Sequence, residues 1–432
     1  MNKQPYPKYK ASGIEWLGEV PEHWEISKIS TLAKRGYKTF VDGDWIESPF
    51  ITEEGIRLIQ TGNIGIGQYK EQGFRFISEE TFLSLNCTEV HPGDVLICRL
   101  AEPVGRACLA PNLDTRMITS VDVTILKPKS DINPKYVVYT LSAASYLEWM
   151  QNICRGGTRD RVSRSMLGAM KIEIPTKEEQ DRITGYLDRE TAKIDTLISK
   201  KQRQIELLQE KRTALISRAV TKGLDPNVKM KDSGVEWLGE VPEHWEIRRL
   251  KHVIKCLDGK RIPLNSEQRG QMQGDYPYWG ANCIVDYVND WLFDEELVLL
   301  GEDGAPFFEP NKDVAFYVSG KIWVNNHTHV LRPKGIIPKY LSYLLNVVDY
   351  RAFVFGSTRD KLTQDDMREI PVQLVPPQEQ KAIVTYLDNE TNKISILISK
   401  IEKSIEKLRE YHATLISAAV TGKIDVRGEK AA

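Results

Sequence analysis

A long heptad-patterned stretch occurs twice in the chain and constrains its fold more than any other feature. The first copy runs from 179 to 221 and the second from 379 to 421, 200 positions later. Neither copy contains a proline, and Gly185 is the only glycine between those bounds. At about 1.5 Å per residue, some forty residues form a helix roughly 60 Å long. The sequence therefore predicts two long helices.

Apolar residues recur along both stretches at alternating spacings of three and four, which is typical of a coiled-coil seam. The predicted seam residues are Leu187, Ile194, Ile198, Ile205, Leu208 and Leu215 in the first stretch, and Leu387, Ile394, Ile398, Ile401, Ile405, Leu408 and Leu415 in the second. Polar residues interrupt the pattern, among them Lys201, Arg212 and His412. Two narrow apolar stripes in one chain are most simply buried against each other, so we expect the helices to pair.

A second repeat shows that the chain consists of two halves of one plan. SGIEWLGEVPEHWEI at 12–26 recurs as SGVEWLGEVPEHWEI at 233–247, a shift of 221 positions. Because the helices are shifted by only 200 positions, the middle of the second half is shorter by 21 residues. Each half thus contains, in order, the motif, a variable domain and a long helix. We interpret the motif as structural, with Trp16, Leu17, Val20 and Trp24 packing against the helices; contact of its acidic residues with a partner is the alternative.

The two variable middles share weaker similarities. N-P-K-Y at 133–136 resembles I-P-K-Y at 337–340, and G-G-T-R-D at 156–160 resembles G-S-T-R-D at 356–360. Short apolar runs bounded by turn residues predict strands at 55–60, 94–100, 121–126, 296–300 and 322–324. We therefore predict an α+β fold, in which a pseudo-two-fold internal repeat gives two α+β domains separated by an antiparallel pair of long coiled-coil helices.

Turn residues and the repeats also define the predicted boundaries. The parts are an N-terminal tail at 1–11, a first variable domain at 12–173, a first helix at 174–222, a linker at 223–232, a second variable domain at 233–374, a second helix at 375–422 and a C-terminal tail at 423–432.

The composition indicates a soluble, cytoplasmic protein. Hydrophobic residues make up 41% of the chain, and no apolar run approaches the ~20 residues that a membrane span needs. The N-terminus lacks the apolar core of a signal peptide. The six cysteines form no CxxC pair and are expected to be reduced thiols without zinc. A net charge of −1 leaves a nucleic-acid partner open, because phosphate binding needs only local basic surface.

Sequence motifs of catalysis are missing from the chain. No G-x-x-x-x-G-K-[ST] loop is present, and the G-N-I-G-I-G run at 62–67 fits a turn better than a dinucleotide loop. Asp258-Gly-Lys260 has the spacing of a nuclease site but lacks acidic support upstream. His327 and His329 fall on one face of a predicted strand and could hold a metal, but with no third ligand evident a hydrogen-bonded pair is the better interpretation. Nothing here argues for an enzyme or a metal site.

Basic residues cluster at matched places in the two halves. A glycine-containing segment carries Arg155, Thr158, Arg159, Arg161 and Arg164, and its counterpart carries Thr358, Arg359 and Lys361. Guanidinium groups on a flexible loop suit phosphates and guanine edges. A solvated charged face is the alternative, but recurrence in both halves favours DNA contact. A second basic stretch lies at 248–261.

Two amide-containing turns are candidate base readers. Gln60-Thr-Gly-Asn63 and Trp279-Gly-Ala-Asn282 occupy comparable positions in the two middles. Asn and Gln side chains pair bidentately with adenine. The same residues are also ordinary in turns and need no function there.

The whole chain resembles the specificity (S) subunit of type I DNA restriction–modification systems. The resemblance rests on the paired WLGEVPEHWE motifs and on two stretches of the form P-x(2–3)-EQ…YLD-x-E-T…LI-S-K…LIS-x-A-V-T, with dissimilar domains between them. It implies that each domain is a target recognition domain for one half of a split DNA site. It also implies that the helices pair antiparallel, set the spacer between half-sites and dock methyltransferase (M) subunits.

The resemblance further implies the partners and cofactors. The chain would be non-catalytic and bind no cofactor, with S-adenosylmethionine in two M subunits, ATP and Mg in two restriction (R) subunits, and double-stranded DNA as the target. At ~3.4 Å per base pair, a ~60 Å helix would separate half-site centres by roughly fifteen to eighteen base pairs. The alternatives are a coiled-coil tether joining two protein- or carbohydrate-binding modules and, third, a tandem enzyme with an unfamiliar site. The target bases do not follow from the sequence.

Overall fold

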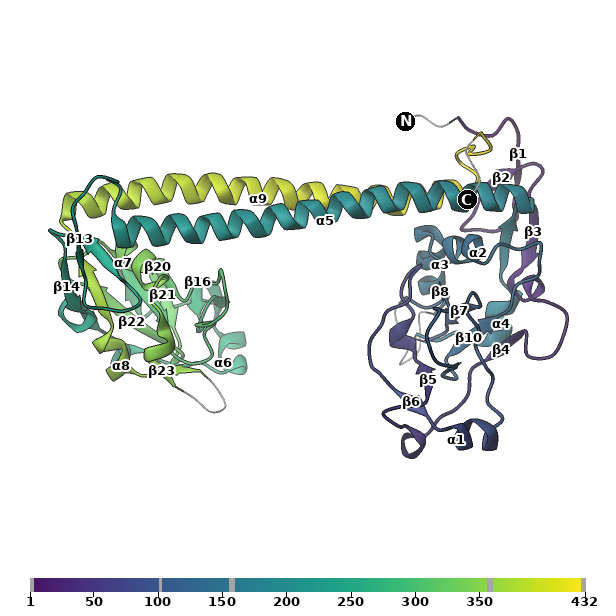
Figure 1. Cartoon of the computed structure of the whole chain (residues 1–432), viewed down its shortest axis with the longest axis horizontal. Helices are drawn as coiled ribbons and strands as arrows, with labels where there is room; N and C mark the ends of the chain where they lie inside the picture. The colour runs from purple at the N-terminus through teal and green to yellow at the C-terminus, as the bar shows by residue number, and fades with distance from the viewer. Residues whose placement is uncertain (1–3, 101–102, 155–159, 356–359, 429–432) are drawn as a thin grey trace. The chain divides into compact units, whose positions relative to one another are not determined.

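The structure is a computed structural model that describes residues 4–100, 103–154, 160–355 and 360–428. The chain forms two compact units, unit 1 from Met1–Lys200 with Ser404–Ala432 and unit 2 from Lys201–Lys403. Two long helices run through both units, α5 (Lys177–Lys222) and α9 (Pro377–Val420) (Figure 1). Each unit therefore contains one variable domain and about half of each long helix.

The variable domain of unit 1 is built from short strands and helices. Its strands are β1 (Tyr9–Ala11), β2 (Glu19–Pro21), β3 (Glu25–Lys28), β4 (Phe40–Asp42), β5 (Ile56–Ile59), β6 (Phe76–Ile77), β7 (Val95–Cys98), β8 (Ala107–Leu109), β9 (Met117–Thr119), β10 (Val123–Leu126) and β11 (Lys171–Ile174). Its helices are α1 (Glu79–Ser84), α2 (Pro134–Thr140), α3 (Ala144–Cys154) and α4 (Arg164–Ala169). An antiparallel sheet has the order β4-β10-β7-β8, and a second sheet has the order β6-β5-β9 with β5 and β9 parallel.

Unit 2 repeats this plan with different lengths. Its strands are β12 (Met230–Asp232), β13 (Glu240–Pro242), β14 (Glu246–Arg249), β15 (Ile254–Cys256), β16 (Gln273–Trp279), β17 (Ile284–Val288), β18 (Phe293–Asp294), β19 (Leu297–Gly301), β20 (Ala315–Val318), β21 (Lys321–Val324), β22 (Thr328–Pro333), β23 (Val354–Phe355), β24 (Lys361–Leu362) and β25 (Pro371–Leu374). Its helices are α6 (Ser266–Gln271), α7 (Pro338–Leu345) and α8 (Gln364–Glu369).

The two domains share one sheet topology despite their dissimilar sequences. The order β15-β22-β19-β20 of unit 2 matches β4-β10-β7-β8 of unit 1, and β16 pairs in parallel with β21 as β5 does with β9. The strands predicted from short apolar runs are all present, as β5, β7, β10, β19 and β21. The predicted α+β fold with an internal repeat is therefore confirmed.

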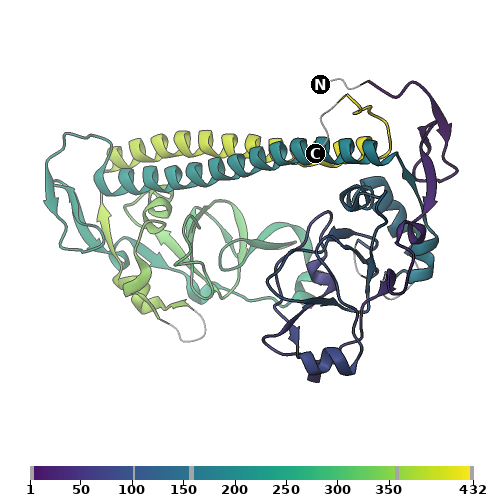
Figure 2. The same ribbon diagram turned by 45° about the vertical axis from the view of Figure 1, so that its right-hand side comes forward.

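The long helices pair along the predicted seam within each unit. In unit 1 the first part of α5 packs with the last part of α9, where Leu187 and Ile194 share a core with Leu415 and Ala419. In unit 2 the last part of α5 packs with the first part of α9, through Ile216 and residues such as Leu387. The helices lie side by side and antiparallel in each unit (Figures 1 and 2). None of the thirteen predicted seam residues is exposed: Leu187, Ile194, Ile198, Ile205, Leu208, Leu215, Leu387, Ile394, Ile398, Ile401, Ile405, Leu408 and Leu415 are each buried or half-buried.

Polar residues that interrupt the seam make defined contacts of their own. Arg212 leaves the seam to donate two hydrogen bonds to the carboxylate of Asp313, at 3.2 and 2.9 Å, in the variable domain of unit 2. His412 lies 3.9 Å from Asp195 on the facing helix in unit 1. The interruptions thus connect the helices to their surroundings at single points.

A glutamine at the start of each long helix ties it to the variable domain. The side chain of Gln180 accepts a hydrogen bond from the Asn133 amide at 2.7 Å, and that of Gln380 accepts one from the Ile337 amide at 2.7 Å. Both glutamines are 1% exposed. About two turns further along, Asp188 accepts a hydrogen bond from Tyr139 at 2.8 Å. These contacts give a physical role to the repeated E-Q and Y-L-D residues.

The repeated EWLGEVPEHWE motif joins one helix start to the other helix end. In unit 1, Trp24 is fully buried, and a Cβ at Gly422, just after α9, would lie 2.4 Å from the Pro21 side chain. His23 lies 2.9 Å from Glu179 in the first turn of α5. Unit 2 repeats these contacts between His244 and Glu379, at 2.9 Å, and between Trp245 and Gly223. The structural interpretation of the motif is supported by this packing.

A buried acid distinguishes unit 1 from unit 2 at the place where the repeated motif, the start of one long helix and the end of the other meet. Glu173 on β11 is fully buried, and neither of its carboxylate oxygens has a hydrogen-bond partner among the described residues. Gln373 occupies the same place on β25 and donates a hydrogen bond to the Val220 carbonyl of α5 at 2.5 Å. Burial raises the pKa of Glu173 to about 8. A protonated Glu173 can donate a hydrogen bond as the Gln373 amide does.

This difference predicts a pH dependence of stability. Between about pH 4.5 and 8 the folded chain keeps a proton on Glu173 that the unfolded chain releases. The free energy of unfolding should therefore fall by about 1.4 kcal/mol per pH unit in that window from this group. Glu173→Gln should remove this slope, and Gln373→Glu should add a second one. Urea unfolding at pH 5.5, 7 and 8 measures both; a slope left intact by Glu173→Gln would show that this acid is not its source.

Candidate nucleic-acid interface

The predicted DNA-contacting loop of unit 1 is described only at its two ends. Arg155, Thr158 and Arg159 lie outside the described residues, between Cys154 at the end of α3 and Asp160. Beyond the loop, the backbone amide of Val162 donates a hydrogen bond to the Arg99 carbonyl at 3.0 Å. The Arg99 guanidinium donates a hydrogen bond to the Val162 carbonyl, also at 3.0 Å. These two hydrogen bonds between Val162 and the buried Arg99, just after β7, form the anchor of the loop end.

The corresponding loop of unit 2 ends on a matching anchor. Thr358 and Arg359 lie outside the described residues. The Leu362 amide donates to the Glu302 carbonyl at 2.8 Å, just after β19, and the Leu362 carbonyl lies 2.9 Å from a ring nitrogen of His329. Val162 and Leu362 are separated by the same 200 positions as the long helices. Both loops are therefore attached at equivalent places to equivalent strands.

The described basic residues at these loop ends are exposed and lie next to acids. Arg161 lies 2.7 Å from Asp122, and Arg164 lies 3.9 Å from Asp42. In unit 2, Lys361 lies 3.6 Å from Glu302. Exposed ion pairs of this kind contribute little stability, about 0 to 1 kcal/mol. These cations can accordingly exchange a carboxylate for a phosphate at small cost.

The second basic stretch is also paired with acids. Arg248 donates to Glu246 at 2.8 Å, and Lys251 donates to Glu369 at 2.6 Å. Arg249 also lies 3.2 Å from Glu369. Two carboxylates thus face three cations of this stretch.

Of the two amides in the 60–63 turn, only one is accessible. Gln60 is half-buried, whereas Asn63 is 2% exposed. The Asn63 side chain accepts a hydrogen bond from the Gln60 amide at 2.8 Å and donates to the carbonyls of Lys70 and Gln72 at 2.9 and 2.7 Å. In this conformation Asn63 has no face to offer a base. It closes the turn instead, and we omit it from the proposed interface.

The 279–282 turn offers more surface. Trp279 ends β16, is half-buried and has its ring 5.5 Å from that of Phe316. Asn282 is exposed in the bend closed by the Gly280 amide and the Cys283 carbonyl, 2.8 Å apart. The Asn325 amide donates to the Trp279 carbonyl, as the Ser120 amide does to that of Ile59. The 60–63 and 279–282 turns thus follow equivalent strands, and Gln60, Trp279 and Asn282 remain candidate readers.

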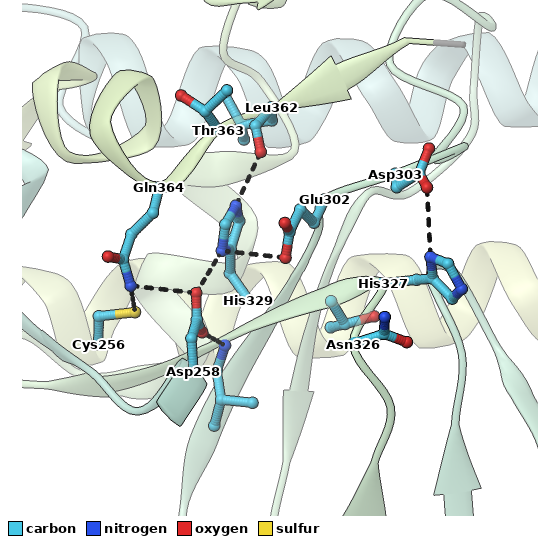
Figure 3. Close-up of polar contacts among 12 residues, drawn as sticks. Cys256, Asp258, Glu302, Asp303, Asn326, His327, His329, Leu362, Thr363 and Gln364 are labelled. Atoms are coloured by element: carbon cyan, nitrogen blue, oxygen red, sulfur yellow. Dashed lines mark hydrogen bonds and ion pairs between the residues drawn. The ribbon is translucent and has the colours of Figure 1, made fainter. Parts of the chain in front are cut away.

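Sequence reasoning missed a buried ionic cluster in unit 2. Asp258, Glu302 and His329 have ligand atoms within 4.8 Å of one another (Figure 3). His329 is fully buried, 2.6 Å from Asp258 and 3.7 Å from Glu302. The predicted pairing of His327 with His329 is wrong, because His327 precedes β22 and faces Asp303 at 3.4 Å. The acids lie 71 and 27 positions from His329, so no local pattern reveals them.

The guanidinium of Arg261 lies against both acids of this cluster. Arg261 donates to Glu302 at 2.6 Å, and its other terminal nitrogen lies 3.7 Å from Asp258. Although burial raises the pKa of Asp258, the hydrogen bond from His329 and the charges of His329 and Arg261 bring it below the ordinary value. Two carboxylates thus face the Arg261 guanidinium and the His329 ring. The cluster is an ion-pair network, not an open coordination site.

The described part of the chain contains no helix with the length and apolar character needed to cross a bilayer. The chain thus has two α+β domains of one sheet topology and two long helices that pair antiparallel within each unit, with exposed basic residues at equivalent loop ends. The profile of the family described as type I restriction modification DNA specificity domain matches residues 21–207 and 242–407. The chain belongs to this family.

Curated relatives agree with this family. The specificity subunit of the type I restriction enzyme MjaIX from Methanocaldococcus jannaschii is 22% identical over 446 residues, covering 95% of each chain. The specificity subunit of the type I restriction enzyme EcoDI from Escherichia coli is 27% identical over 188 residues, 43% of this chain and 40% of that protein. The predicted class, a type I specificity subunit, is thereby confirmed.

Two solved structures share the fold. One comes from work on complex assembly and conformational transition of the type I restriction–modification system and matches with a TM-score of 0.69 at 12% identity, covering 94% of this chain and 99% of that one. The HsdS subunit of Thermoanaerobacter tengcongensis matches with a TM-score of 0.50 at 13% identity, covering 94% and 98%. At these identities the likeness concerns the fold alone.

The buried position of Asn63 predicts a structural rather than a recognition phenotype. Asn63→Ala removes all three hydrogen bonds of a buried side chain, so the free energy of unfolding should fall by about 2 to 4 kcal/mol. Asn282→Ala, at an exposed site, is the matched control and should change it by less than about 0.5 kcal/mol. Urea unfolding compares the two variants. Equal stability of both would contradict the internal role of Asn63.

Proposed function

We propose that each variable domain reads one half of a bipartite DNA target through its basic loop. The observation that carries this proposal is the matched attachment of the two loops, at Val162 in unit 1 and Leu362 in unit 2. Arg161 and Arg164 in unit 1 and Lys361 in unit 2 are exposed at the loop ends. Arginine and lysine supply both phosphate contacts and major-groove contacts to guanine. Gln60, Trp279 and Asn282 would contact bases from the neighbouring turns.

The long helices would set the distance between the two half-sites. A helix is stiff over this length, and α5 and α9 each continue without a break through residues of both units. The repeated Gln180 and Gln380 contacts fix each domain to its helix start. The spacer of the target would therefore follow from helix length and not from domain sequence.

The exposed faces of the same helices would dock two M subunits. Apolar side chains outside the seam remain substantially exposed on both helices, with Leu197, Leu207, Ile396 and Leu397 each 47% exposed. In unit 2, Leu207 and Leu397 line a shallow groove together with Leu208 and Ile401. Exposed apolar groups that are contiguous in this way are characteristic of protein interfaces. We assign the groove to this contact.

Catalysis would belong to the partners of this chain. In the proposed assembly two M subunits carry S-adenosylmethionine for DNA methylation, and two R subunits carry ATP and Mg for cleavage. Arg261 donates to Glu302 in the ion-pair network at His329. This pairing supports a non-catalytic role for the cluster of Asp258, Glu302 and His329.

Removal of a loop arginine should weaken DNA binding. Arg159→Ala and Arg359→Ala should each raise Kd about tenfold and lower the salt slope by about one, if the side chain contacts a phosphate. Arg203→Ala is a suitable control, because Arg203 lies on the exposed surface of α5 and pairs with Glu206 at 2.8 Å. Fluorescence anisotropy with a duplex carrying the target at several salt concentrations provides the measurement. Unchanged affinity in both loop variants would remove the loop assignment.

Lengthening both helices should lengthen the permitted spacer. One heptad inserted after Lys200 and one after Lys403, the points where the two units divide, adds about 10 Å, or roughly three base pairs. Mapping of methylated positions in cells that carry the variant with its M subunit tests this expectation. The half-sites themselves should stay the same; a change in their sequence would refute the role of the helices as spacers.

A further inference from the structure

The two loop anchors use the same contact but different cations. In unit 1 the Arg99 guanidinium binds the Val162 carbonyl at 3.0 Å, and its Nε lies 3.1 Å from Asp42. In unit 2 the ring of His329 lies between the Leu362 carbonyl at 2.9 Å and Asp258 at 2.6 Å. Arg99 and His329 are 4% and 0% exposed. A buried nitrogen-bearing side chain thus joins the loop end to a carboxylate in both units; Figure 3 shows the contacts of His329 in unit 2.

The contacts of His329 determine how many protons its ring carries. A backbone carbonyl only accepts, so the nitrogen facing Leu362 must carry a proton. Asp258 receives hydrogen bonds from the Val330 amide at 2.8 Å and from Gln364 at 3.3 Å as well as facing His329. A carboxyl group surrounded by donors in this way is ionised and has no proton to give. Both ring nitrogens must therefore donate, which requires an imidazolium.

We infer that protonated His329 is the positioning residue that anchors the DNA-contacting loop of unit 2, in the place that Arg99 takes in unit 1. This inference rests on the proposed function for its consequence in DNA binding, but not for the anchoring itself. A guanidinium keeps its charge at every physiological pH, whereas an imidazole loses its charge within the pH range that proteins experience. The second half-site would accordingly be read in a pH-dependent manner and the first would not.

The other charged groups around His329 favour the same state. Asp258 and Glu302 face the ring, and Arg261 lies beyond them, 2.6 Å from Glu302. Lys361 pairs with the same Glu302 at 3.6 Å, so the loop end and the ring share one carboxylate. Cys256 contacts Gln364, not the ring. Loss of the ring proton would leave the two acids facing the half-buried Arg261 and the exposed Lys361, and would remove the donor to Asp258.

Nuclear magnetic resonance of the full chain tests the protonation state directly. The chain labelled with ¹⁵N only in histidine has seven ring systems, and His329→Gln identifies the signal of His329. Both of its ring nitrogens should carry protons at pH 7. A single-proton tautomer at that pH would overturn the inference.

Amide exchange tests the anchoring, with unit 1 of the same molecule as its control. The amides of Leu362 and Val162 make equivalent hydrogen bonds to Glu302 and Arg99. Protection of Leu362 relative to Val162 should fall about tenfold above the pH at which His329 loses its proton, and in His329→Gln at every pH. His327→Gln, two residues away with its half-buried ring facing Asp303 instead of Leu362, should leave the ratio unchanged. An identical ratio in His329→Gln and the unmodified chain would refute the anchoring.

A second variant keeps the test decisive if His329→Gln does not fold. In Asp258→Asn the side-chain amide can donate to a neutral imidazole, so the bond to Leu362 persists without the extra proton. This variant should retain protection of Leu362 but lose its pH dependence. Protection that still falls with pH in Asp258→Asn would place its cause outside the His329–Asp258 pair.

Binding to a duplex that carries both mapped half-sites, measured with the chain and its M subunit, separates the two proposals. Discrimination against a changed second half-site should drop about tenfold above the His329 transition, with the first half-site unaffected. If no DNA is bound at any pH while the exchange result holds, the proposed function fails and the anchoring stands. If DNA is bound with no loss of discrimination, the inferred role in reading fails.

Discussion

Burial of one narrow apolar stripe on each long helix is the interaction on which the rest of the structure depends. Leaving these stripes exposed to water would cost hydrophobic free energy along both helices. Antiparallel pairing solves this within each unit, because the first part of one helix meets the last part of the other around Leu187 and Leu415 in unit 1 and around Leu387 and Ile216 in unit 2. Because the helices are antiparallel, the start of one lies beside the end of the other in each unit. One motif, EWLGEVPEHWE, therefore contacts both.

Polar contacts then convert a nonspecific apolar pairing into a defined one. The buried glutamines Gln180 and Gln380 satisfy backbone groups of the variable domains, and His23 and His244 lie against the glutamates of the first helical turns. Each of these groups would lose a hydrogen bond if the start of a helix slid by one turn against its own domain. Domain sequences can therefore diverge, as the two middles of this chain have done, while the frame that presents their loops stays the same.

The sequence predicts well those features that depend on local periodicity. The heptad pattern predicts the two helices and every seam residue, and short apolar runs predict strands such as β7 and β19, because burial at fixed spacing needs no knowledge of distant neighbours. Features created by distant contacts were not predictable. Asn63 is a residue type that can read a base, but the fold brings the carbonyls of Lys70 and Gln72 to its side chain, which donates its hydrogen bonds to them. His329 is predicted to pair with His327, but its partners Asp258, Glu302 and Leu362 come from distant segments of the chain.

The division of the chain into units has a consequence for its biosynthesis. Unit 2 is one continuous segment, Lys201–Lys403, whereas unit 1 combines Met1–Lys200 with Ser404–Ala432. On the ribosome the part made first must therefore wait, with Leu187 and Ile194 uncovered, until the last helix has emerged. The core of unit 2 can form before the core of unit 1 is complete. The order of completion in the nascent chain is thus the reverse of the order of translation, and the early segment is the one that needs protection by chaperones from aggregation.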